Sequence, residues 1–454
     1  MRIAVVVVAL SCAACGGEFV LRPPTAVDDE SDAGPVDDDA GLPTDDAGVA
    51  TDAGLAADAG DESDAGPVDD DAGLPDDDAG LPDVPREMRG LWITRFAITS
   101  EAALTGILDR AAEHGVNAVF VQVRGAGDAY YASNVEPWAR GLTGVLGRDP
   151  GWDPLGVAVS HGHALGLEVH AYVNALAGWP ANLGEPTVAE GTIQHALYTH
   201  PEWTAVDSSG ANTDGEYIWF SAANPEVRAH TAAVVADLLT HYDVDGVHLD
   251  RIRMPGPDYT RDDVALARFA DAQLETPSLT FAEFMREEVN LVVEDTFVAL
   301  LETRPEARLS AAVWGIYERL PGCFTSQGKL DYHQDSIEWT QRGIIDALAP
   351  MIYWGESPGA CTDFRAHTSF FVDESAPKDV WTGVHVTEIN DGSFDADALV
   401  GRLATSLDEG ATGSLLYASA MFDADTARWD VLLGDDAEPG PFFEPIAAPG
   451  PAIR

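Results

Sequence analysis

The sequence predicts an α/β protein whose folded part is a (β/α)8 TIM barrel, preceded by a signal or lipoprotein segment and a disordered acidic linker. From residue 88 onward, short apolar runs alternate with longer amphipathic stretches, as in parallel sheets with crossover helices. A doubly wound open sheet is the competing fold, but no run is followed by its glycine-rich phosphate-binding fingerprint. The eight predicted strands are 89–96, 116–124, 167–174, 244–252, 308–316, 347–354, 380–386 and 414–419.

Residues 1–15 have the pattern of an export signal. The apolar stretch 3–10 is too short to span a bilayer, and small residues precede Cys15 as in a bacterial lipobox. This predicts lipidation at Cys15, with Cys12 as a second candidate and an ordinary cleaved signal as the alternative. We therefore expect an exported lipoprotein, anchored to a membrane and facing the periplasm or the cell surface.

A low-complexity segment follows at 16–85. The string ESDAGPVDDDAGLP at 30–43 recurs unchanged at 62–75, and the segment has too few aromatic and β-branched residues to fold. It is predicted to be a disordered linker. The folded barrel domain is placed at 86–435 and a Pro/Gly-rich C-terminal tail at 436–454.

The charge balance limits the partners. Lys and Arg total 25 against 77 Asp and Glu, a formal charge of −52, which argues against nucleic acid because its binders need a basic surface. No apolar run reaches the roughly 20 residues of a membrane-spanning helix, so membrane contact is expected through the lipid alone. No protein partner and no cofactor are indicated.

Two cysteines fall within the predicted barrel. Cys323 and Cys361 are expected in an exported compartment, which permits a disulfide between them.

Side-chain alternation places polar groups at one end of the barrel. In the third predicted strand, apolar residues alternate with His170 and Asn174, and in the fourth with His248 and Asp250. By the same alternation Arg124 ends the second strand on the inward face. Barrel enzymes carry their chemistry at the carboxyl ends of the strands, so this pattern predicts an enzyme.

Several runs then resemble a known family. They are 88–94, 119–124, 127–131, 137–138, 142–144, 150–155, 170–174, 244–255 and 349–354. In this order they resemble the glycosyl hydrolase-like 10 family of exported bacterial barrels, over roughly residues 85–429. The resemblance implies a (β/α)8 fold that hydrolyses glycosidic bonds, with bacterial cell-wall glycan as the plausible substrate.

Glycoside hydrolysis generally uses two carboxyl groups, about 5–5.5 Å apart in retaining enzymes and about 6.5–9.5 Å apart in inverting ones. Asp250 is the predicted nucleophile or base, because neighbouring arginines favour its ionised form. The catalytic acid stays open among Asp128, Glu356 and Glu318, each of which follows a predicted strand.

Sugar binding is assigned to aromatic and polar side chains near the strand ends. Trp92 is a further aromatic candidate, and for Trp92 and Trp314 filling of the barrel interior is the alternative. The predicted substrate-binding residues are Gln122, Arg124, Asn174, His170, His248, Arg253, Trp138, Trp314, Tyr353 and Trp354.

Two alternatives to a glycosidase stay open. One is a glycan-binding barrel without catalysis. The other is a metal-dependent hydrolase or deacetylase in which His170, His248 and Asp250 converge. No metal site is predicted, since the His161 and His163 pair lacks further ligands in sequence.

Overall fold

The structure is a computed structural model that describes residues 86–435 and 437–452. The predicted signal segment 1–15 with Cys15, the predicted linker 16–85, and residues 436, 453 and 454 lie outside the described residues.

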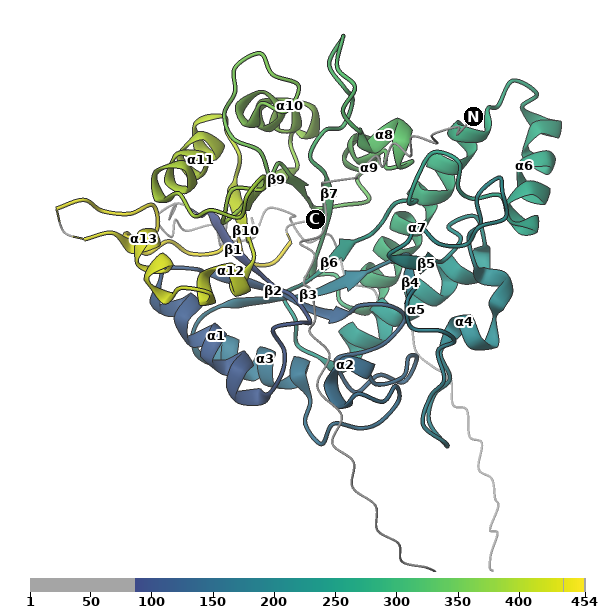
Figure 1. Ribbon diagram of the computed structural model, residues 1–454, viewed down its shortest axis with the longest axis horizontal. Coiled ribbons are helices and arrows are strands. Elements are labelled where there is room, and N and C mark those ends of the chain that lie inside the picture. The colour runs from purple at the N-terminus through teal and green to yellow at the C-terminus, as the bar shows by residue number, and fades with distance from the viewer. Residues whose placement is uncertain (1–85, 436, 453–454) are drawn as a thin grey trace, which may run out of the picture. The chain divides into compact units, whose positions relative to one another are not determined.

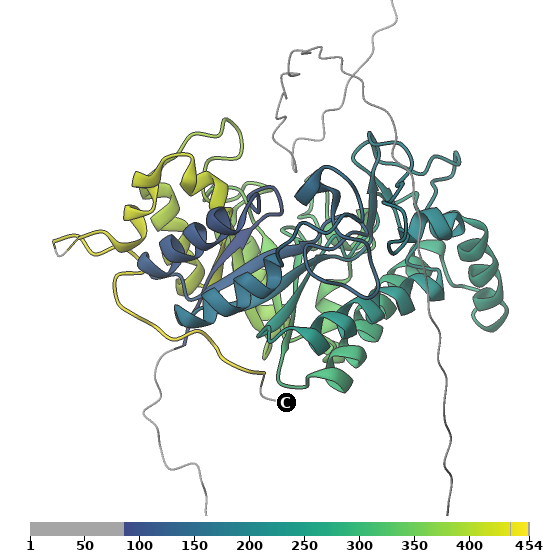
Figure 2. The same cartoon turned by 90° about the horizontal axis from the view of Figure 1, so that it is seen from below.

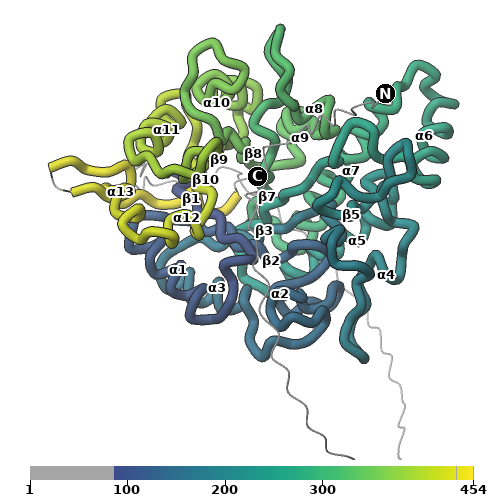
Figure 3. Tube along the Cα trace, in the orientation of Figure 1, coloured from purple at the N-terminus to yellow at the C-terminus, as the bar shows by residue number. Residues whose placement is uncertain are grey.

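Eight parallel strands close into a barrel, which confirms the predicted fold. Around the barrel they follow the order β1-β10-β9-β8-β7-β6-β3-β2, and the helices lie outside them (Figure 3). The strands are β1 Met88–Ile93, β2 Ala118–Arg124, β3 Glu168–Asn174, β6 Gly246–Asp250, β7 Arg308–Trp314, β8 Ala347–Met351, β9 Asp379–His385 and β10 Gly413–Tyr417.

The helices that return the chain between barrel strands are α1 Glu101–Glu113, α3 Pro154–Ala164, α5 Pro225–His241, α7 Phe281–Thr303, α9 Ser336–Arg342, α10 Phe364–Ser375 and α11 Ala396–Asp408 (Figure 1). Local chemistry fixes where several of them begin. Thr280 and Glu283 form a capping box on α7, and Asp153 caps α3 with Pro154 in its first turn. In the described part of the chain, no helix has the length and apolarity needed to cross a membrane.

Shorter elements extend the connections that leave the carboxyl ends of the strands. The connection from β3 to α5 contains β4 and β5, which pair as a separate antiparallel sheet. Since these insertions follow strand ends, they surround the mouth of the barrel. They are α2 Arg140–Thr143, β4 Ala177–Pro180, α4 Ala196–Thr199, the 3-10 helix η1 Pro201–Trp203, β5 Tyr217–Trp219, α6 Asp263–Glu275 and α8 Gly328–Asp331; after β10 come α12 Ser419–Asp423, η2 Thr426–Arg428 and α13 Asp430–Leu433.

Alternation along the strands divides the core into two layers. On β2, Phe120 packs inside the barrel with Trp381, whereas Val119 and Val121 pack in the layer between strands and helices. This is the period of two expected when each strand buries both of its faces.

The C-terminal segment runs along the end of the barrel opposite the mouth (Figure 2). Arg86 donates to the carbonyl of Pro449 at 2.7 Å, Arg89 to that of Glu444 at 2.7 Å, and Arg308 to that of Gly450 at 2.6 Å. The domain was predicted to end at residue 435, whereas these bonds tie residues beyond that point to the barrel.

A disulfide joins Cys323, in the connection after β7, to Cys361, in the connection after β8. Their Cα atoms are 5.7 Å apart. The two loops are therefore fixed to each other at the mouth.

Candidate active site

Asp250 is the last residue of β6, and its carboxylate is held at the barrel mouth by two short hydrogen bonds. The Tyr172 hydroxyl donates to Oδ2 at 2.5 Å, and the backbone N–H of Arg251 donates to Oδ1 at 2.5 Å. Arg251 has a φ of 51°, a left-handed conformation that is uncommon for a residue with a side chain. The turn after β6 therefore orients the carboxylate from the backbone side.

The charges around Asp250 keep it ionised. Burial by itself raises the pKa of Asp250, but Arg253, Arg251 and the Tyr172 hydroxyl outweigh burial and lower this pKa below its ordinary value. In turn, burial and the charge of Asp250 raise the pKa of Tyr172 well above its ordinary value. Tyr172 therefore stays a hydrogen-bond donor to a carboxylate at neutral pH.

Arg253 lies between Asp250 and two aromatic rings, that of Trp314 at the end of β7 and that of Tyr332 directly after α8. Its Nη1 lies 3.6 Å from Asp250 Oδ1, and its guanidinium lies 5.6 Å from the ring centre of Trp314 and 5.8 Å from that of Tyr332. Among the described residues, this buried Nη1 has no hydrogen-bond partner. The predicted sites Arg253 and Trp314 therefore do lie beside Asp250.

The two predicted histidine sites lie deeper in the barrel than the mouth. His248 Nε2 accepts from the indole of Trp92 at 3.0 Å, and its Nδ1 is 2.9 Å from the hydroxyl of Ser310. Burial lowers the pKa of His248 to about 3, so the ring is neutral and Nδ1 donates to Ser310. His170 lies further from the mouth than His248, and its ring stacks on that of Phe120 with the ring centres 4.5 Å apart.

Both histidines are thus fully buried core residues rather than substrate ligands, which corrects that prediction. The possible metal site of His170, His248 and Asp250 is not formed either, because both nitrogens of His248 already have partners within the barrel. Trp92 belongs to the interior as well, the alternative that was left open for it.

Arg124 does not face the mouth, and a bulge is the reason. The β2–β3 register shifts between Gln122 and Arg124, so that Arg124 pairs with Val173, whose side chain packs in the outer layer. Its guanidinium is fully buried against Glu136, with two bonds of 2.8 and 2.7 Å. The prediction that Arg124 binds substrate is wrong for this reason.

Gln122 and Asn174 lie near the mouth but serve its loops. Gln122 accepts from the backbone of Arg95 at 3.0 Å and donates to Asn174 at 3.2 Å, and Asn174 donates to the carbonyl of Gly125 at 2.8 Å. Both amides are buried. The structure thus shows them positioning the connections after β1 and β2.

The three candidates for a second carboxyl lie in different surroundings. Asp128 is buried and accepts from the backbone of Ala126 at 3.0 Å. Glu356 is bonded to Thr405 on α11 and lies 3.7 Å from Arg365 on α10, so it contacts the outer helices. Glu318 is exposed and pairs with Lys329 at 2.8 Å.

Asp128 is the candidate whose charge acts on a residue connected to the Asp250 site. Burial lowers the pKa of Arg95, but Tyr217 and Asp128 more than compensate and raise it. Arg95 in turn donates to the Tyr217 hydroxyl at 2.7 Å, and the Tyr217 ring lies 5.3 Å from the guanidinium of Arg251. Asp128 therefore acts electrostatically on an arginine whose own contacts lead to Arg251, the residue after Asp250.

The remaining aromatic candidates divide by strand face. Tyr353 packs against the interior layer, 5.5 Å from Tyr417 at the end of β10. Trp354, the next residue, is partly buried and packs against the cluster that fills the layer between strands and helices. Trp138 is partly exposed in the connection after β2.

The sequence reasoning assigned no role to several residues of the site. Tyr172 was visible in the inward-facing pattern of β3, and its position two residues before the strand end was the signal that could have identified it. Tyr417 ends β10 and His385 ends β9, and the centres of their rings lie 5.7 Å apart. Glu216, which pairs with Arg251 at 3.1 Å, lies in a long insertion, where no sequence pattern indicated it.

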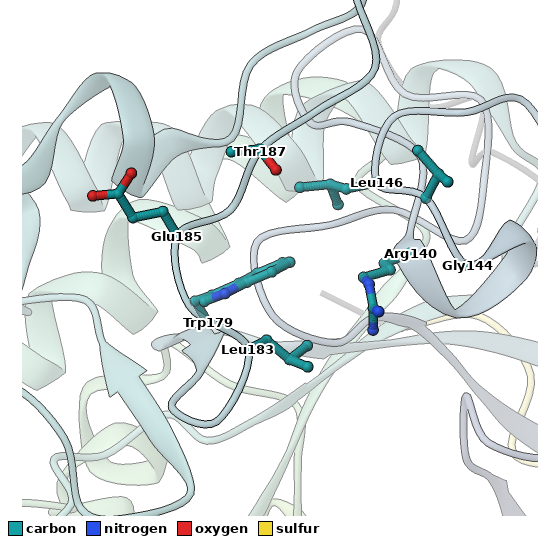
Figure 4. A pocket seen from close by; sticks show the side chains of 8 residues that line it. Arg140, Gly144, Leu146, Trp179, Leu183, Glu185 and Thr187 are labelled. Atoms are coloured by element: carbon teal, nitrogen blue, oxygen red, sulfur yellow. The ribbon is translucent and has the colours of Figure 1, made fainter. Parts of the chain in front are cut away.

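A small pocket lies beside the mouth, between the connection after β2 and the segment after β4 (Figure 4). Its volume is about 280 Å³, and Trp179 and Arg140 face each other across it, with Thr187 and Leu146 to one side. Trp179 itself is almost wholly buried, so it offers little surface for stacking. Asp250 does not line this pocket.

One group of described side chains has donors that a metal ion accepts. Ligand atoms of His200, Glu202 and Glu226 lie within 4.8 Å of one another. The group is exposed at the β3–α5 insertion and does not include Asp250 or its partners.

Comparison with known proteins places this barrel among the glycosidase-like folds. Residues 87–398 match the family described as glycosyl hydrolase-like 10. Glycosyl hydrolase YngK of Bacillus subtilis is 27% identical over 288 residues, covering 59% of this chain and 54% of the relative. Glycosyl hydrolase DigH of Escherichia coli K12 is 25% identical over 306 residues, covering 60% of this chain and 67% of the relative. The chain thus spans about half the length of YngK.

Two solved structures show the same fold at low identity. The glycoside hydrolase domain of PgaB (BpsB) from Bordetella bronchiseptica has a TM-score of 0.56 at 14% identity, covering 76% of this chain and 99% of that one. Alpha-L-fucosidase isoenzyme 2 from Paenibacillus thiaminolyticus has a TM-score of 0.52 at 15% identity, covering 76% of this chain and 48% of the fucosidase chain.

Proposed function

Because the chain belongs to the glycosyl hydrolase-like 10 family, we propose that it is a glycoside hydrolase that cleaves cell-wall or related bacterial glycans, with Asp250 as its nucleophile or base. The observation that carries this proposal is the state of Asp250. An ionised carboxylate, oriented by Tyr172 and the Arg251 N–H at a barrel mouth, has the charge and position that attack on an anomeric carbon or on water requires.

A second carboxyl completes the proposed chemistry. Glu216 pairs with Arg251 at 3.1 Å, and Asp128 acts electrostatically on Arg95, which bonds Tyr217 beside Arg251. One of these two carboxyls would protonate the leaving oxygen. Asp128→Asn and Glu216→Gln separate the two. Loss of the general acid slows hydrolysis of poor leaving groups far more than that of activated aryl glycosides, since these depart without a proton.

The activity is tested by incubating the purified protein with peptidoglycan glycan strands and measuring new reducing ends. Release by the wild type that is absent in Asp250→Asn supports hydrolysis. Binding without release, unchanged in Asp250→Asn, would instead support a glycan-binding barrel that lacks catalysis.

Removing the Tyr172 hydroxyl is expected to change how activity depends on pH. This hydroxyl helps keep the pKa of Asp250 low, so in Tyr172→Phe that pKa rises and Asp250 becomes protonated at higher pH. A hydrogen bond to a charged group contributes about 1.5–3 kcal/mol, so the acidic limb of kcat/KM should move up by about one pH unit or more. The measurement is a pH–rate profile from acidic to neutral pH.

Tyr242→Phe is the matched control for this experiment. Tyr242 donates to Asp153 at 2.5 Å, an equivalent hydrogen bond between the end of α5 and the start of α3. An acidic limb that stays in place in Tyr172→Phe would show that this hydroxyl does not control the ionisation of the catalytic group.

We further propose that the protein is exported and lipidated at Cys15. The support is the pattern of small residues before this cysteine and the acidic repeats after it. Fatty-acid labelling in a bacterial host that is lost in Cys15→Ala and retained in Cys12→Ala would support this assignment, and the reverse result would move the anchor to Cys12.

A further inference from the structure

Three aromatic side chains in the described part of the chain are exposed, and all three lie in connections that leave the carboxyl ends of barrel strands. Phe96 is 74% exposed after β1, Tyr198 is 52% exposed in α4, and Phe324 is 95% exposed after β7. Every other aromatic side chain in the described part of the chain is buried or partly buried. Exposed rings are thus concentrated on the side of the molecule that carries Asp250.

Phe96 is connected to Asp250 from the β1 side. The guanidinium of Arg95 lies 4.5 Å from the Phe96 ring centre and covers one of its faces. The same guanidinium donates to Tyr217, whose ring lies against Arg251, the residue that follows Asp250. The other face of Phe96 is left to solvent, on a side chain held in place by this cation–π contact.

Phe324 is connected to Asp250 from the opposite side. Its neighbour Cys323 is bonded to Cys361, which braces the connection between β7 and α8 where it projects from the barrel (Figure 1). Two residues further on, the carbonyl of Ser326 accepts from the indole of Trp314 at 3.0 Å. Trp314 in turn lies against Arg253, 3.6 Å from Asp250.

The two rings follow strands that lie on opposite sides of the barrel. In the closed barrel, three strands separate β1 from β7 in either direction, so these strands face each other across it. With strands about 4.8 Å apart and tilted by about 36°, an eight-stranded barrel is about 15 Å across. A ligand that reaches both rings must therefore be longer than one or two sugar units and must cross the mouth, at whose rim Asp250 ends β6.

The size and isolation of the rings indicate the kind of ligand. One aromatic side chain offers at most about 150–250 Å², far below the roughly 800 Å² per partner in a stable protein interface. Polar Thr99 and Ser100 stand three and four residues after Phe96, and Thr325 and Ser326 directly follow Phe324. An isolated ring beside hydrogen-bonding groups matches a pyranose, which has an apolar C–H face and hydroxyls around its edge.

We propose that Phe96 and Phe324 are two sugar-stacking platforms on opposite sides of Asp250, which select long glycan chains over short oligosaccharides. The proposal rests on the proposed function, because it takes the substrate of this mouth to be a glycan. It adds that substrate length is sensed by two rings outside the reacting centre. A chain bound at both platforms presents an internal bond to Asp250, so the protein cleaves within chains.

The test uses the full chain and compares long peptidoglycan glycan strands with disaccharides prepared from them. Binding is measured in the Asp250→Asn background, and cleavage in the wild-type background. Phe96→Ala and Phe324→Ala should each weaken binding of long strands about three- to tenfold and leave disaccharide binding unchanged. Phe→Trp at either position should restore long-strand binding, because the larger ring stacks as well.

Leu407→Ala is the matched control, since Leu407 is an exposed apolar residue on α11, away from the mouth connections. Unchanged long-strand binding in both Phe→Ala variants, or equal loss for long and short glycans, overturns the platforms even if the wild type is active. Long-strand binding that needs both rings, in a wild type that releases no reducing ends, instead overturns hydrolysis and leaves the platforms standing. A wild type that binds no strands overturns both.

Discussion

We expect Asp250→Asn to reduce the rate of glycan hydrolysis by about 10³-fold or more, the loss typical when a nucleophile or general base is removed. The substitution keeps the shape of the side chain but removes its charge. The Tyr172 hydroxyl and the Arg251 N–H would then both point at an amide, and Arg253 would lose the anion 3.6 Å away. The measurement is the initial rate of reducing-end release at saturating substrate.

Folding has to be followed in the same experiment, because Asp250 is a buried carboxylate among arginines. Asp243→Asn is a suitable control, since Asp243 precedes the other end of β6, is mostly exposed and pairs with Arg304 at 2.6 Å. We expect this control to retain activity. An Asp250→Asn variant that is folded and keeps more than a tenth of the wild-type rate would remove Asp250 from the mechanism.

The second large effect concerns Arg124 and Glu136. We expect Arg124→Met to lower the free energy of unfolding by about 3–5 kcal/mol, because it leaves the fully buried Glu136 carboxylate without its main counter-charge. The double variant Arg124→Met with Glu136→Leu should recover part of this loss, since no buried charge is left. Chemical denaturation followed by tryptophan fluorescence measures both.

The loss of unfolding free energy in Arg124→Met should also depend on pH. In the wild type, burial raises the pKa of Glu136, but Arg124 and His230 lower it far below its ordinary value. Without Arg124, burial dominates and the folded-state pKa of Glu136 exceeds the unfolded value of about 4.3, so protonation below that pH favours the folded variant. The difference between variant and wild type should therefore be smaller at about pH 4 than at pH 7.

Arg342→Met provides the comparison. Arg342 bonds Glu287 through both terminal nitrogens, at 2.9 and 2.6 Å, on partly exposed helices. Solvent screens this pair, so its loss should cost less than about 1 kcal/mol. Equal effects of the two substitutions would contradict a special cost for the buried charge.

The barrel could be read from the sequence because its signals are local and repeated. Each predicted strand is an apolar run between amphipathic segments, and all eight correspond to barrel strands, although several ends differ by a few residues. The position of Asp250 followed from the same alternation, since β6 has no bulge before its last residue. Trp314 and Arg253 were placed near the mouth because both lie close to strand ends.

The site predictions that were wrong are those in which tertiary contacts overrode a rule based on neighbouring residues. Alternation placed Arg124 at the mouth, but the bulge after Gln122 turned it outward. Glu356 follows a strand as Asp128 does, yet Thr405 and Arg365 hold it against the outer helices. Alternation also shows that His170 and His248 point inward, but not that they lie below the mouth.

The sequence by itself determined the number of the barrel strands and their order along the chain, the inward faces of β3 and β6, and the aspartate that β6 delivers to the mouth. Only the tertiary structure decided which groups distant in sequence surround that aspartate: Tyr172 directly, and Glu216 through Arg251. The physical reason is the distance along the chain over which each feature is determined. Alternation and strand ends depend on adjacent residues, whereas a shared site depends on how bulges and long insertions bring distant residues together.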